Sequence, residues 1–166
     1  GSWVRCGWDG GAVEVVYKEE RSGGTGSCGV VRWWKGNGGR VVLFAGFGSG
    51  RIVSYLLEEG AEGCDFNLRV VSKLNLGSAI KCLEVVRDTI LVGCADGGLR
   101  AVSIIESAQF NTTPRLWKAV HGGPCAGISC ISADFNKDSK GEEVLMIATG
   151  AEDGTVVLSE LRDIII

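Results

Sequence analysis

Short apolar runs, each followed by a glycine-rich turn, alternate along this chain of 166 residues. Runs rich in Val, Ile and Leu that are joined by a tight turn are typical of β-hairpins. The four pairs of runs are 3–8 with 12–17, 40–46 with 51–57, 89–95 with 99–105, and 144–151 with 155–161. Their turns lie at Asp9-Gly10, 47–50, Asp96-Gly97 and Asp153-Gly154. None of the runs keeps an apolar stripe at the helical period for long, so the pattern predicts strands.

Further strand candidates extend the last three hairpins into units of four strands. Each of these hairpins is preceded by another apolar segment, at 28–34, 79–86 and 126–135, and two of these segments by a shorter run, at 68–74 and 115–120. Equivalent turn positions are Asp9, Ser49, Asp96 and Asp153, so successive turns lie 40, 47 and 57 residues apart. Four-stranded units with a period of about 40–45 residues are typical of β-propeller blades. The sequence therefore predicts an all-β fold of propeller type.

The stretch from His121 to Leu158 carries the clearest copy of this unit. It opens with HGG, continues through two apolar strands, and closes with the hairpin TGAEDGTVVL. In this order it resembles a WD40 repeat, and three weaker copies cover nearly all the rest of the chain. The resemblance implies a WD40-like β-propeller made of four-stranded antiparallel blades.

The same resemblance implies a structural role for the polar residues of this unit. In WD40 repeats the opening His, a Ser or Thr of the second strand, the turn Asp and a Trp of the third strand form a buried hydrogen-bonded tetrad. The resemblance places His121, Thr149 and Asp153 in the first three positions, with Ser159 in place of the tryptophan. We therefore expect His121 to be a partner of Asp153 and not a catalytic base.

Strand counting gives about three and a half blades in a single propeller segment that spans residues 1–166. The blade segments are 3–19, 28–58, 68–106 and 115–163. Known propellers have at least about four blades, and a shorter array leaves sheet edges exposed. We expect the chain to be a fragment of a larger propeller. The alternative is a second chain that completes the ring.

Net charge and hydropathy disfavour two classes of partner, nucleic acids and membranes. The formal net charge is -3, so the chain has no basic field that would hold a phosphate backbone, and nucleic acid is disfavoured as a direct partner. The start of the chain lacks the basic and apolar regions of a signal peptide. No apolar run reaches the ~20 residues that a membrane-spanning helix needs, so we expect no membrane partner.

The seven cysteines include no Cys-x-x-Cys pair, and one histidine, His121, is available to share a metal. A zinc site is therefore not expected. Cysteines beside Val and Ile behave as small apolar residues when they are reduced. This composition favours a cytoplasmic or nuclear protein.

One loop has the alternate spacing of a calcium-binding loop. Oxygen-bearing side chains stand at Asp134, Asn136 and Asp138, with Glu142 following, and integrin-type FG-GAP propeller repeats carry a similar loop. The glycine expected after the third ligand is Ser139, and lysines lie within the segment. A solvated loop between two strands is the simpler interpretation, and calcium stays the alternative.

No catalytic constellation is visible in the sequence. A glycine-rich phosphate loop that leads into a helix, a Ser-His-Asp order and a credible carboxylate pair are all missing, so we expect neither an enzyme nor a cofactor. In WD40 propellers, residues just before the turn Asp face the mouth of the central channel. The resemblance therefore implies a protein-binding rim that includes Trp8, Phe47 and Glu152.

The leading hypothesis is a non-catalytic WD-repeat scaffold that binds other proteins within a complex. A second hypothesis is a non-catalytic propeller subunit of an RNA-modifying enzyme, because GAEDGTVVL resembles a segment of the tandem-propeller subunit that partners a tRNA 2′-O-methyltransferase. A basic patch from Arg32, Lys35, Arg40 and Arg51 would favour this second function. A third is a calcium-stabilised FG-GAP-type propeller, which a calcium-dependent melting temperature would favour.

Overall fold

The computed structural model describes residues 5–8, 11–14, 27–59, 66–105, 108–117, 120–122 and 126–161. Within them the chain forms antiparallel strands, a 3₁₀ turn at Asn37–Gly39 and, in the described ranges, no α-helix. The strands are β1 (Arg5–Trp8), β2 (Gly11–Glu14), β3 (Cys28–Lys35), β4 (Val41–Phe47), β5 (Arg51–Glu59), β6 (Phe66–Asn75), β7 (Ile80–Val86), β8 (Thr89–Cys94), β9 (Leu99–Ile105), β10 (Gln109–Phe110), β11 (Arg115–Trp117), β12 (Ile128–Lys137), β13 (Glu143–Ala151) and β14 (Val156–Leu161).

These strands form three larger sheets, which we call blades. Blade 1 has the order β3-β4-β5-β6, blade 2 the order β7-β8-β9, and blade 3 the order β12-β13-β14. Two short strands, β10 and β11, both pair with the outer edge of β9 and together take the place of a fourth strand in blade 2. A separate pair, β1 with β2, forms the first hairpin expected from the sequence.

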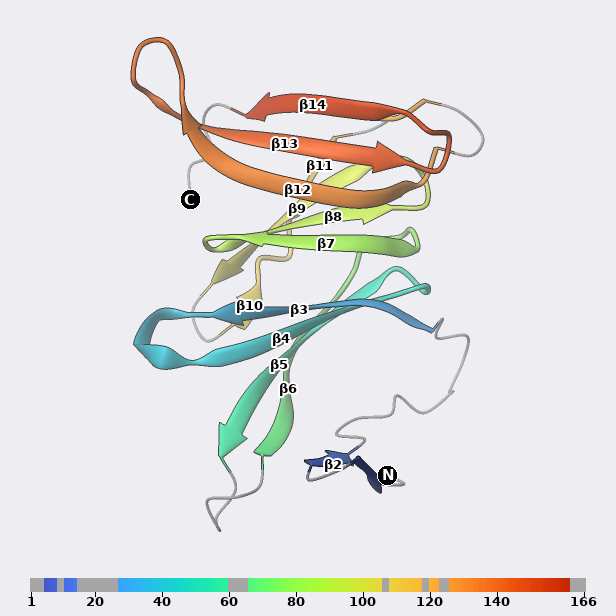
Figure 1. The fold of residues 1–166 in the computed structure, drawn as a ribbon, viewed down its shortest axis with the longest axis vertical. Helices are drawn as coiled ribbons and strands as arrows, with labels where there is room; N and C mark the ends of the chain where they lie inside the picture. Colours follow the sequence, from blue (N-terminus) through green and yellow to red (C-terminus); the bar gives the residue numbers. More distant parts are fainter. Residues whose placement is uncertain are drawn as a thin grey trace.

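The blades follow one another along the long axis of the molecule, with blade 2 between blades 1 and 3 (Figure 1). The first strand of each later blade packs on the preceding blade: β7 on β3 and β4, and β12 on β7 and β8. One apolar core lies between blades 1 and 2 and includes Phe44, Leu83 and Ile90. A second core lies between blades 2 and 3 and includes Leu91 and Ile128. Face-to-face packing of four-stranded sheets is how propeller blades bury their apolar faces, so the predicted all-β, propeller-type fold is confirmed.

The structure corrects the strand content of the predicted units. The run 68–74, grouped with the strands that follow it, is part of β6 and pairs with β5 of blade 1. The run 115–120, grouped with the last unit, contributes β11 to blade 2. The reason is the same in both cases, because each outer strand completes the sheet that precedes it in the chain before the chain crosses to the next sheet.

The three hairpin turns are geometrically equivalent. In each turn a glycine with positive φ donates its N–H to the last residue of the preceding strand: Gly50 to Phe47, Gly97 to Cys94, and Gly154 to Ala151. A glycine adopts this left-handed conformation without the penalty that a side chain brings. The alignment of Ser49, Asp96 and Asp153, the residues before these glycines, is therefore confirmed.

A β-bulge recurs at the start of each blade. The register shifts between Cys28 and Val30 in blade 1, between Ile80 and Cys82 in blade 2, and between Ile128 and Cys130 in blade 3. After the bulge, Val30, Cys82 and Cys130 lie opposite Gly46, Gly93 and Gly150. The three blades can therefore be compared residue by residue.

Glycines at this position receive the next blade. A Cβ added at Gly46 would lie 2.5 Å from Ile80 Cγ2, and a Cβ added at Gly93 would lie 2.7 Å from Ile128 Cγ2. Both distances are below a normal carbon–carbon contact, so the isoleucine of the next blade occupies the space that a side chain would need. Each of the two blade–blade contacts thus includes an isoleucine packed on a glycine.

The structure contains no helix long and apolar enough to span a membrane within the residues that it describes.

Candidate functional site

His121 lies between blades 2 and 3 and links polar groups of both. Its side chain is buried, and its backbone N–H donates to the carbonyl of Gly97 in the turn of blade 2 at 3.5 Å. Its ring contacts two hydroxyls of blade 3: Nε2 lies 2.8 Å from Thr149 Oγ1, and Nδ1 lies 2.7 Å from Thr155 Oγ1. Thr155 in turn lies 2.6 Å from Asp153 Oδ1. The structure therefore brings His121, Thr149 and Asp153 into one network, with Thr155 between the ring and the carboxylate.

The direction of the hydrogen bonds in this network follows from the carboxylate. An ionised carboxylate only accepts, so Thr155 donates its hydroxyl proton to Asp153 and accepts from the protonated Nδ1 of His121. In the neutral ring, Nε2 then accepts from the Thr149 hydroxyl. The side-chain and backbone hydrogen bonds of Thr155 hold the pKa of Asp153 below its ordinary value. Both ring nitrogens are engaged, which is the arrangement of a structural histidine.

Thr155 is not among the residues predicted from the WD40 resemblance, although the sequence contains a signal for it. A hydroxyl or amide two residues after a turn Asp can bond to that carboxylate, and the backbone N–H of Thr155 donates to Asp153 Oδ1 at 2.9 Å. Ser159 holds the position of the missing tryptophan. It lies on β14, opposite Ile147 of β13, and is half-buried. No hydrogen bond joins Ser159 to the network among the described residues.

The equivalent turn of blade 2 uses an ion pair in place of the threonine. Arg100 donates two hydrogen bonds to Asp96, at 3.0 Å to Oδ1 and 2.6 Å to Oδ2, and the Arg100 side chain is almost fully buried. The backbone N–H of Gly98 donates to the same carboxylate at 3.0 Å. The arginine, followed by this backbone hydrogen bond, lowers the pKa of Asp96 to about 2. A bidentate pair of this kind defines the hairpin geometry strongly.

The residues of the predicted protein-binding rim differ in exposure. Phe47 is 5% exposed and packs with Ala45, Val53 and Tyr55, so it is a core residue and not an exposed anchor. Glu152 is exposed and pairs with Lys81 of blade 2 at 3.0 Å. Trp8 lies on β1, and its side chain is outside the described part of the structure.

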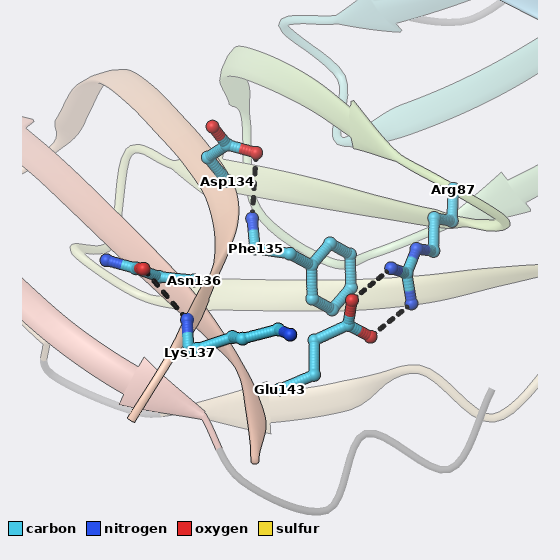
Figure 2. Close-up of polar contacts among 6 residues, drawn as sticks. All are labelled: Arg87, Asp134, Phe135, Asn136, Lys137 and Glu143. Atoms are coloured by element: carbon cyan, nitrogen blue, oxygen red, sulfur yellow. Dashed lines mark hydrogen bonds and ion pairs between the residues drawn. The ribbon is translucent and has the colours of Figure 1, made fainter. Parts of the chain in front are cut away.

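The proposed calcium loop is a β-hairpin in the structure. Asp134 and Asn136 lie on β12, and each accepts a hydrogen bond from the backbone N–H of the next residue, both at 2.8 Å (Figure 2). Asp138 Oδ1 accepts from the N–H groups of Lys140 and Glu142 at 2.8 and 2.9 Å. These oxygens accept hydrogen bonds from local backbone N–H groups. Among the described residues, no group of three His, Cys, Asp or Glu side chains is placed to hold a metal ion.

Arg87, which sequence analysis did not single out, holds this hairpin against the other blades. Its guanidinium donates to both carboxylate oxygens of Glu143, at 2.8 and 2.6 Å, and lies 3.6 Å from the ring centroid of Phe135 (Figure 2). The Arg87 carbonyl accepts a hydrogen bond from Trp34 Nε1 of blade 1 at 2.8 Å. One turn of blade 2 therefore contacts blades 1 and 3. Sequence patterns give no signal for this contact, because its members are far apart along the chain.

Among the described residues, exposed large apolar side chains lie on all three blades; the three most exposed lie at the two ends of the stack, whereas Ile105 and Leu116 of blade 2 are 47% and 44% exposed. On the outer face of blade 3, Val156 and Leu158 are 77% and 68% exposed. On the outer face of blade 1, Trp33 is 57% exposed and Val31 is also exposed, both on β3. Several exposed apolar side chains on one sheet face are typical of a surface that binds protein. The candidate site is therefore the pair of end faces.

Three of the four basic residues considered for a patch interact with other groups. Arg32 lies 3.9 Å from Glu84 of blade 2, which places an acidic group beside one of its four members. Arg40 and Arg51 also interact with other groups.

Comparisons with known proteins give likenesses to solved structures. No family model and no curated protein matches the chain. The Dos1 propeller is similar with a TM-score of 0.48 and 15% identity over 70% of this chain, which spans 29% of the Dos1 propeller chain. The computationally designed Ika4 protein is similar with a TM-score of 0.41 and 16% identity, over 84% of this chain and 94% of that protein. Neither likeness carries information on function.

Proposed function

We propose that this chain is a non-catalytic scaffold of WD40-like propeller type, which binds other proteins within a complex through the end faces of its stack of blades. The observation that carries this proposal is the exposure of Val156 and Leu158 on one end face and of Trp33 on the other. Burial of an apolar side chain of this size is favourable by about 1.5–3 kcal/mol, so a complex in which a partner covers these side chains is stabilised.

Other features support a binding role without chemistry. The two ring nitrogens of His121 are occupied by threonine hydroxyls, which leaves neither free to accept a substrate proton. Four cysteines among the described residues, Cys28, Cys82, Cys94 and Cys130, are free thiols. Free thiols are stable in reducing compartments, which supports a cytoplasmic or nuclear location.

The test is purification of the tagged protein from its source cells at its native level, with quantitative mass spectrometry of the proteins that accompany it. We expect at least one protein at a stoichiometric amount. Trp33→Asp or the double variant Val156→Asp/Leu158→Asp should reduce that amount strongly. Leu116→Asp is the matched control, because Leu116 is also exposed but lies on β11, away from both end faces.

Two results would contradict the proposal. One is a protein that purifies alone at native level. The other is recovery of RNA in place of protein, which would favour the subunit of an RNA-modifying enzyme.

A further inference from the structure

The outer face of blade 3 can be compared with the face of blade 2 that blade 3 covers. In blade 2 one cross-strand row consists of Cys82, Gly93 and Leu99. The same row of blade 3 consists of Cys130, Gly150 and Val156. The two rows occupy the same register after the same bulge, so the same side of each sheet is being compared.

These equivalent rows have opposite exposure. Cys82 is buried and Leu99 is 2% exposed, whereas Cys130 is exposed and Val156 is 77% exposed. The next row shows the same contrast, because Ala101 is half-buried and its counterpart Leu158 is exposed. The difference is the neighbour, since blade 3 covers the face of blade 2 and no described strand covers the face of blade 3.

The glycine of this row shows what the neighbour contributes. Ile80 occupies the space over Gly46, and Ile128 occupies the space over Gly93. A Cβ added at Gly150 would meet Cys130 Sγ of its own blade at 2.7 Å, and no described side chain of another blade lies within 4 Å of it. The space over Gly150 is therefore open to a side chain of the size of isoleucine from another blade.

A second copy of this chain does not supply the missing side chain from its first blade. The position in blade 1 that corresponds to Ile80 and Ile128 is Cys28, which is much smaller. On the same face of blade 1, Ala45 and Val53 are buried within the chain, so the exposed apolar side chains of this face are those of Val31 and Trp33 on β3. The described blades thus hold no free isoleucine at this position.

We propose that the face formed by Cys130, Gly150, Val156 and Leu158 binds a further antiparallel β-blade from outside these 166 residues, whose first strand places an isoleucine or valine on Gly150. The occupant continues an interface that the chain already forms twice, at Gly46 with Ile80 and at Gly93 with Ile128. Its first strand lies over β12 and β13, as β12 lies over β7 and β8. This inference rests on the proposed function and names the kind of partner that one end face accepts.

Cys130 is a built-in reporter for this interface. The thiol is exposed in the chain by itself and would be covered by the docked blade. We would label the isolated chain and the native assembly with N-ethylmaleimide and follow the peptide that contains Cys130 by mass spectrometry. The control is the variant Leu116→Cys, which places a thiol on an exposed position of β11.

We expect Cys130 to react at least about tenfold more slowly in the native assembly than in the isolated chain, because a covered thiol must wait for local opening before it reacts. The thiol at position 116 should react at similar rates in both. Leu158→Asp should restore fast labelling of Cys130 in material from the cells, and Leu116→Asp should not. Because residue 158 is exposed, the variant should keep the fold, which its circular dichroism spectrum checks.

A photo-reactive amino acid at position 158 identifies the occupant. The expected cross-link joins it to a strand with alternating apolar residues in a polypeptide segment outside these 166 residues. A cross-link to residues of this same sequence, which would mean a second copy, overturns the inference. Equal labelling of Cys130 in the isolated chain and the assembly also overturns it. If partner proteins accompany the chain while Cys130 labels at equal rates, this inference fails and the scaffold proposal stands.

Discussion

Blade 2 and blade 3 have the same bulge, the same turn and the same cross-strand rows, yet only blade 2 is covered on both faces. Leu99 and Val156 occupy the same place in the two sheets, and their exposed fractions are 2% and 77%. The strand pattern therefore sets where an apolar face forms, and the neighbouring sheet decides whether that face is core or surface. A blade at the end of a stack presents a surface shaped like an interior, which is why it can act as a binding face.

Truncation of the covered leucine should have the largest effect on stability. Leu99→Ala should lower the free energy of unfolding by about 2–5 kcal/mol, because it leaves a cavity between blades 2 and 3. Val156→Ala, its counterpart, should change the free energy by less than about 0.5 kcal/mol in the isolated chain. Urea unfolding followed by circular dichroism measures both. Equal costs at the two positions would show that the outer face of blade 3 is covered in the isolated chain as well.

The equivalent glycines of blades 2 and 3 should also differ in the stability cost of an added side chain. Gly93→Ala should destabilise the chain by about 2–3 kcal/mol, because the added methyl group would meet Ile128 and Cys82 and so overpack the interface. Gly150→Ala meets only the exposed Cys130 thiol, which can rotate away, so its cost should stay below about 1 kcal/mol. The same unfolding measurement applies. A large loss of stability in Gly150→Ala would contradict an open space over this glycine.

The buried histidine network is a feature of blade 3 that blade 2 lacks, since Val92 holds the position of Thr149. Thr149→Val should cost about 1–3 kcal/mol of stability, because it leaves Nε2 of the buried His121 without a partner. Leu76 is the residue that corresponds to His121 after blade 1, because each follows the outer strand of its blade and donates its backbone N–H to the carbonyl of a turn glycine. Leucine therefore already stands at the equivalent position. The double variant Thr149→Val/His121→Leu should therefore recover part of the loss. No recovery would mean that His121 contributes through packing and not through this hydrogen bond.

The smallest expected effect concerns acid stability of the two turns. The pKa of Asp96 in the folded chain, about 2, is lower than its ordinary value of 3.8. Its contribution to stability is therefore fully present above the ordinary value and is lost as the pH falls from about 4 to about 2. Asp96→Asn should flatten the dependence of stability on pH in this window.

Asp153→Asn is the matched variant in the other turn. The pKa of Asp153 is also lowered, but a threonine and not an arginine is its main partner, so the change in slope should be smaller. Unfolding curves measured at several pH values between 2 and 5 test the order of the two effects. A larger change in the Asp153 variant would contradict the role assigned to Arg100.

The hairpins and their turns could be predicted because their signals are local. An Asp or Ser before a glycine, between two apolar runs, identifies all three turns correctly. The partners of outer strands 66–75 and 115–117 could not be predicted, because an apolar run does not state which edge it joins. In the candidate site, His121, Thr149 and Asp153 came from the WD40 resemblance, whereas Thr155, Arg87 and the open face depend on packing between blades. Phe47 was misplaced for the same reason, since a residue at a turn can still point into the core.

The most direct measurement is the structure of the native assembly, purified from the source cells and determined by electron cryomicroscopy. We expect density for another antiparallel sheet on the outer face of β12–β14, with a branched aliphatic side chain over Gly150 and with Val156 and Leu158 buried. An outer face of blade 3 that is open to solvent in the assembly, with partner proteins bound elsewhere or missing, would contradict the role of this face.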